Sequence, residues 1–187
     1  MSKKYVDLET LKYILYDIHK LEDLLVRERF KDHDIESLNL FIDSVKTFSD
    51  RELYPYFKEM DETPAYYKEG TVIVHEQVKI MMLQGGEMGI ISASFDYDSG
   101  GLQIPFTALQ AAIYIMEAAN NHLPSYAGLT SGSAELIIEF GNKELNEIYV
   151  PKMISGVWSE MLEFEIETPC LELDTSEKSP EQLVEEI

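Results

Sequence analysis

The chain has little cysteine and little positive charge. Among its 187 residues Cys170 is the one cysteine, which excludes a disulfide framework within the chain and a cluster of metal-binding thiolates. Fifteen Lys and Arg stand against 35 Asp and Glu, so the formal net charge is −20. A field of that sign repels nucleic-acid backbones and anionic membrane surfaces, and we expect neither as a partner.

Signals for export or membrane insertion are also missing. No apolar stretch follows the two lysines near the amino terminus, so we expect no secretory signal and a cytoplasmic location. The apolar passage at residues 105–119 has fifteen residues, too few to cross a hydrocarbon core of about 30 Å.

The common catalytic motifs are absent from the sequence. His19, His33, His75 and His122 are scattered, and none follows a glutamate at the Glu-x-x-His spacing of helical metal sites, so we predict no metal site. Neither a phosphate-binding Walker loop nor a Gly-x-Ser-x-Gly nucleophile motif occurs. The pair Gly100-Gly101 favours a tight turn over a phosphate site. We predict no catalytic residue.

What the chain does have is a strongly apolar helix at residues 105–119. Of residues 108–119 only Gln110, Tyr114 and Glu117 carry polar side-chain atoms, at the i, i+4, i+7 spacing of one helix face. We expect neighbouring helices to surround the remaining faces, and the three polar side chains to need partners if they are buried.

The rest of the chain favours helices. The spacing of apolar residues predicts amphipathic helices over residues 8–30 and 35–60, the second kinked around Arg51 to Pro55. Residues 62–70 read as a connector, 90–95 as an extended segment, and 96–101 as a turn. Further helices are predicted at 75–83, 128–140 and 143–153. We therefore predict an all-α orthogonal bundle of five to seven helices over residues 1–158, followed by an acidic tail at 159–187.

Small side chains dominate the start of the helix near residue 128. The stretch from Ser125 through Gly128, Leu129 and Gly132 permits either close helix packing, which the spacing alone favours, or a groove that admits an alkyl chain. The sequence leaves both alternatives open.

Several segments in order resemble the N-terminal helical domain of the acyl-CoA dehydrogenase family. Residues 52–61 are similar to the family's early kinked helix. Residues 86–91 and 95–102 are similar to its Gly-Leu-x-Gly and Tyr-Gly-Gly-x-Gly-Leu passage. Residues 128–156 resemble its signature ending Tyr-x-Pro-x-x-x-x-Gly, although Glu147 or Ile148 stands where the family has lysine. The resemblance runs from about Ile35 to Trp158.

The resemblance implies a function in fatty-acid oxidation. Family members are oxidoreductases that bind FAD, pass a hydride from the β-carbon of an acyl-CoA to the flavin, and remove the α-proton with a carboxylate. The N-terminal domain forms one wall of the acyl pocket, which the resemblance assigns here to Ser125, Gly128, Leu129 and Gly132. Flavin contacts and the catalytic base come from a middle β-domain and a C-terminal helical domain.

Residues 159–187 resemble neither of those two domains. Residues 160–187 hold ten Asp and Glu against one Lys, and we expect a partly ordered tail in which Leu162, Phe164 and Ile166 form a strand over the face near Trp158. We therefore expect a truncated family member that binds no FAD and is inactive alone. The alternative is a helical interaction module whose exposed apolar face binds another protein or a second copy.

Overall fold

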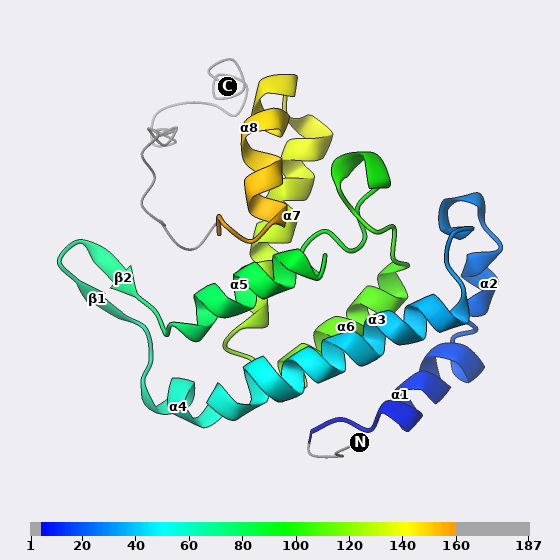
Figure 1. Cartoon of the computed structure of the whole chain (residues 1–187), viewed down its shortest axis with the longest axis horizontal. Coiled ribbons are helices and arrows are strands. Elements are labelled where there is room, and N and C mark those ends of the chain that lie inside the picture. The colour runs from blue at the N-terminus through cyan, green and yellow to red at the C-terminus, as the bar shows by residue number, and fades with distance from the viewer. Residues whose placement is uncertain (1–4, 160–187) are drawn as a thin grey trace, which may run out of the picture.

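The computed structural model describes residues 5–159 (Figure 1). Over these residues the regular elements are helices apart from one short hairpin, which confirms the all-α prediction. The helices and strands are α1 (Leu8–Tyr13), α2 (Glu22–Leu25), α3 (Ile35–Phe48), α4 (Phe57–Glu62), β1 (Tyr66–Lys68), β2 (Thr71–Ile73), α5 (Gln77–Glu87), α6 (Phe106–Ala119), α7 (Pro124–Phe140) and α8 (Lys143–Ile154). Short π and 3₁₀ segments join several of them.

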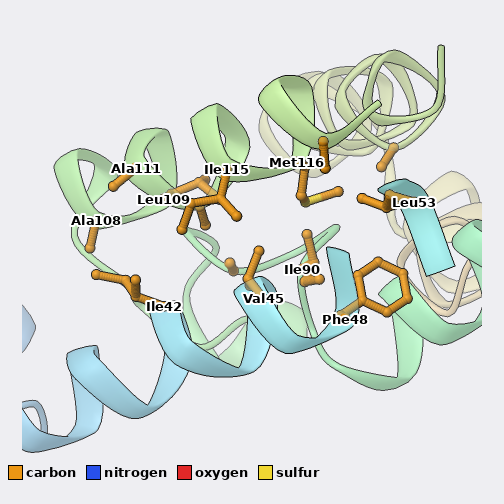
Figure 2. Close-up of a cluster of buried hydrophobic side chains, with 14 of the residues drawn as sticks. Ile42, Val45, Phe48, Leu53, Ile90, Ala108, Leu109, Ala111, Ile115 and Met116 are labelled. Carbon is orange, nitrogen blue, oxygen red and sulfur yellow. The ribbon is translucent and has the colours of Figure 1, made fainter. Parts of the chain in front are cut away.

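The core lies between α3 and α6, which pack side by side (Figure 2). Ile42 and Val45 of α3 meet Leu109, Ile115 and Met116 of α6, and all five are buried. Alanines on α6 carry little side-chain bulk, so the α3 side chains lie close to its backbone. The α7–α8 pair stands across this layer, as an orthogonal bundle requires (Figure 1).

The polar stripe of α6 faces solvent, and the apolar side chain of Phe106 lies on the same outer face, where none of the described helices covers it. Phe106 and Tyr114 are 65% and 52% exposed, and Gln110 and Glu117 are exposed as well. The polar stripe that the sequence indicated therefore faces outward, so these side chains have solvent available and need no buried partner.

The predicted break in the long helix lies at the expected position. A capping box between Asp34 and Ser37 begins α3, which ends at Phe48. A π segment, η3 (Ser49–Leu53), and a 3₁₀ turn, η4 (Tyr54–Tyr56), follow before α4. Pro55 has no backbone N–H to continue the α-helical pattern, so the geometry changes beside it.

Two side chains from other elements satisfy carbonyl groups at this break. The amide of Gln77, at the start of α5, donates to the Glu52 carbonyl at 2.8 Å. The amide of Asn120, at the end of α6, donates to the Leu53 carbonyl at 3.1 Å. Since buried carbonyl groups need donors, these bonds fix α5 and α6 against the break.

Three local expectations differ from the structure. Residues 90–95 form turns rather than an extended segment, so their apolar character reflects burial of Ile91 and Ala93. The connector at 62–70 contributes to a hairpin, in which Tyr67 pairs with Val72. Helix α5 continues through Gly85 and Gly86 instead of ending there, and the missing side chain at Gly86 leaves room for the Ser155 carbonyl to approach the helix.

The helices of residues 8–30 are shorter than the periodicity predicted. Hydrogen bonds connect this region to the loop at residues 94–103. The Arg29 guanidinium donates to the Asp96 carboxylate and, at 3.1 Å, to the Ser94 carbonyl. The Gln103 amide returns a bond to the Arg29 carbonyl at 2.9 Å. These contacts hold the 94–103 loop, which begins beside the groove described below.

Helices α7 and α8 form an antiparallel pair with a small core of its own. Met153 is buried there, whereas Ile154 and Trp158 are half-buried. The strand expected around Leu162, and the rest of the acidic tail, lie outside the described residues. Within residues 5–159 no helix is both long and apolar enough to span a membrane.

Candidate functional site

The candidate site is a groove in the corner between α6 and α7. The turn at Asn120 joins these two helices, which then diverge, and the groove occupies a volume of about 280 Å³. Its lining consists of Ile90, Ser94, Phe106, Leu109, Gln110, Ile113, Met116, Glu117, Pro124, Ser125, Ala127, Gly128, Ser131, Gly132 and Glu135. A concave surface of mainly apolar side chains with a few polar groups is typical of small-ligand sites.

Two glycines keep the α7 wall of this groove open. A Cβ atom built on Gly128 or on Gly132 would meet no heavy atom within 4 Å. Close helix packing, which the spacing favoured, would place a neighbouring backbone against these positions. The small side chains therefore line an open groove on this face of α7.

Three of the four predicted site residues line the groove. Ser125, Gly128 and Gly132 lie on the α7 face that looks toward α6. Leu129 does not line it and is 48% exposed. The α7 residues that line the groove occupy one arc of the helix, and Leu129, rotated by about 100° from Gly128, falls outside the edge of that arc.

The α6 wall was missed as a site by sequence reasoning. Leu109, Ile113 and Met116 supply its apolar surface, and Gln110 and Glu117 supply its polar groups. Periodicity identified α6 as a core helix, and it cannot distinguish an apolar face that packs on α3 from one that lines a groove. The Gln110–Glu117 stripe was the available signal, since it marked the side of α6 that stays solvated.

The electrostatic character of the groove is negative. Glu117 of α6 and Glu135 of α7 both line it, and no Lys, Arg or His is among the lining residues. Partial burial raises the pKa of the Glu117 carboxyl. Within residues 5–159 neither glutamate has a hydrogen bond or an ion pair, so their charges are not neutralised by a neighbouring side chain.

The histidines lie elsewhere and form no metal centre. His75 Nε2 is 3.4 Å from the Glu59 carboxylate and His122 Nε2 is 3.8 Å from the Asp61 carboxylate, on two sides of α4. Across residues 5–159 no group of three His, Cys, Asp or Glu side chains is arranged to hold a metal ion.

Comparison with known proteins identifies one domain family. The model of the acyl-CoA dehydrogenase N-terminal domain matches residues 36–157 of the 187 in the chain. No curated protein matches the chain. The matched segment begins in α3 and ends after α8, and it contains both walls of the groove.

Proposed function

Because the chain belongs to the acyl-CoA dehydrogenase family, by its match to the N-terminal domain, we propose that the α6–α7 groove holds the hydrocarbon chain of an acyl-CoA thioester. The observation that carries the proposal is the open glycine wall at Gly128 and Gly132. Ser125 belongs to the same wall, whereas Leu129 lies outside it.

Hydrophobic burial supplies the binding energy in this proposal. Leu109, Ile113 and Met116 present an apolar surface to the groove. Each methylene that moves from water onto such a surface contributes about 0.8 kcal/mol when it is fully buried, and less in an open groove. The phosphate groups of CoA lie outside the groove, because no cation lines it and two carboxylates do.

The same charges make the groove unsuitable for FAD, the cofactor of the intact family. The diphosphate of FAD would lie beside Glu117 and Glu135 with no cation among the lining residues. We therefore assign no flavin contact and no hydride-transfer step to this groove. The proposed contribution of these residues is to bind and orient the acyl chain.

A binding measurement with paired variants tests the proposal. Titration calorimetry with dodecanoyl-CoA should show saturable binding, and Gly128→Leu should weaken it at least tenfold by filling the groove. Leu129→Ala alters the adjacent residue outside the groove and should leave the affinity unchanged. Leucine favours the helical conformation over glycine by about 0.5–1 kcal/mol, so Gly128→Leu should not destabilise α7. A loss of binding would then reflect the filled groove rather than unfolding. Equal affinities for all three proteins would refute the proposal.

A second candidate function is a protein-interaction module, favoured by one exposed stripe on α7. Leu129, Leu136 and Phe140 are 48%, 61% and 80% exposed, and their spacing places them on one helix face. Exposed apolar stripes of this kind mark interaction surfaces. If this stripe binds a second copy, sedimentation equilibrium should show a concentration-dependent dimer that Phe140→Ser abolishes. A monomer at every concentration would exclude self-association.

A further inference from the structure

The two carboxylates of the groove occupy different parts of it. Glu117 lies near the end of α6, close to the corner where the turn at Asn120 leads into α7. Glu135 lies eleven residues beyond Pro124 on α7, about 16 Å along the helix axis. A chain lying along the α7 wall therefore has its end near one or the other carboxylate.

In the described part of the chain neither carboxylate has a partner that would reduce its effect on a ligand. No hydrogen bond or ion pair is made to Glu117 or Glu135 by the rest of residues 5–159, and Gln110 supplies a neutral amide between the apolar residues. Both carboxylates are solvent-exposed, and burial is still sufficient to raise the pKa of Glu117. A like charge brought close to either of them is repelled even across solvent, and salt weakens this repulsion.

We propose that Glu117 and Glu135 make the groove selective for acyl chains without negative charge, so that chains ending in a carboxylate are excluded. This inference rests on the proposed function, because it presupposes that the groove takes an acyl chain. The substrate class is then a monocarboxylic aliphatic acyl group. Dicarboxylic acyl groups, which carry a second carboxylate at the far end, are rejected.

Ligands that differ only at the chain end test this selectivity. Dodecanoyl-CoA, its ω-carboxylate analogue and its ω-ammonium analogue would be titrated into the full chain at pH about 8 and low ionic strength. The two charged analogues both lose hydration on binding, so their affinity ratio isolates the sign of the charge. We expect the ammonium form to bind about tenfold more tightly than the carboxylate form, and added salt to reduce this ratio.

Variants that remove one negative charge test which carboxylates cause the difference in affinity between the ammonium and the carboxylate analogue. Glu117→Gln and Glu135→Gln should each lower the ratio, and the double variant should bring it close to the ratio that the net charge alone produces. Glu144→Gln changes the net charge equally at an exposed site on α8 that does not line the groove, and it should leave the ratio unchanged. Circular dichroism would confirm that each variant remains helical.

The outcomes separate the inference from the function on which it rests. If dodecanoyl-CoA binds but the ratio is the same in the wild type, the double variant and Glu144→Gln, the selectivity is refuted and the acyl site stands. If no acyl-CoA binds, both proposals fail. A ratio that falls equally in Glu144→Gln would show a general effect of net charge and would also refute a role for the two groove carboxylates.

Discussion

The side-chain amide of Asn120 donates a hydrogen bond to the backbone carbonyl of Leu53 across 67 residues of sequence, with 3.1 Å between nitrogen and oxygen. Both residues are buried. The side-chain oxygen Oδ1 of Asn120 also accepts a hydrogen bond from the backbone N–H of His122 at 3.1 Å. One side chain thus ties the π break after α3 to the turn that forms the corner of the groove.

Replacing Asn120 should destabilise the fold. Asn120→Leu leaves the Leu53 carbonyl without this donor and the His122 N–H without this acceptor, at a cost of about 2 kcal/mol. Urea denaturation followed by circular dichroism measures the change. Asn121→Leu, at the next and exposed position, is the control and should change stability by less than about 0.5 kcal/mol. Equal effects of the two variants would contradict the proposed role of the bond.

The adjacent glycines of α5 should respond to alanine in opposite directions. At Gly86 a Cβ would lie 2.2 Å from the Ser155 carbonyl oxygen, so Gly86→Ala should cost about 1–3 kcal/mol despite its better helix propensity. At Gly85 the nearest atom would be the Met81 sulfur at 3.9 Å, so Gly85→Ala should stabilise the protein by about 0.5–1 kcal/mol. The melting temperatures of the two variants measure these opposite effects. A higher melting temperature for Gly86→Ala would contradict the close contact between Gly86 and the Ser155 carbonyl.

A buried lysine on α3 depends on its acidic partner. Lys46 is 1% exposed, pairs with the Asp50 carboxylate, and lies 4.6 Å from the ring centroid of Tyr5. Asp50→Ala leaves this cation unpaired and should cost about 2–4 kcal/mol. In a Lys46→Met background the same substitution should cost less than about 1 kcal/mol, because no buried charge remains. A double-mutant cycle by chemical denaturation measures the difference, and additive effects would rule out the dependence.

The Glu117 carboxyl should make stability depend on pH. Its folded-state pKa is raised by burial, so the folded protein binds this proton more tightly than the unfolded chain does. That contribution is present below the unfolded pKa and is lost as pH rises through the folded pKa. Glu117→Gln should therefore raise stability at about pH 7 and have little effect below about pH 4, in urea denaturation at both values. A stabilising effect that is equal at both pH values would contradict this assignment.

The prediction of the fold from the sequence succeeded where a local pattern has one physical solution. Helix α6 was predicted because its apolar residues leave only a narrow polar stripe, and the break beside Pro55 was predicted because proline cannot continue the α-helical hydrogen bonds. Residues 90–95 were misread as extended. A short apolar run has no period of its own, and only burial of Ile91 and Ala93 explains it.

The sequence by itself determined the helical class, the family resemblance and the small residues at Gly128 and Gly132. Whether those glycines touch another helix or face a groove depends on the angle between α6 and α7, and the packing of α6 on α3 and of α7 on α8 sets that angle. The tertiary structure alone placed Glu117 and Glu135 in one groove and Leu129 outside it, because residues eighteen positions apart on two helices line a common surface only after the helices have packed.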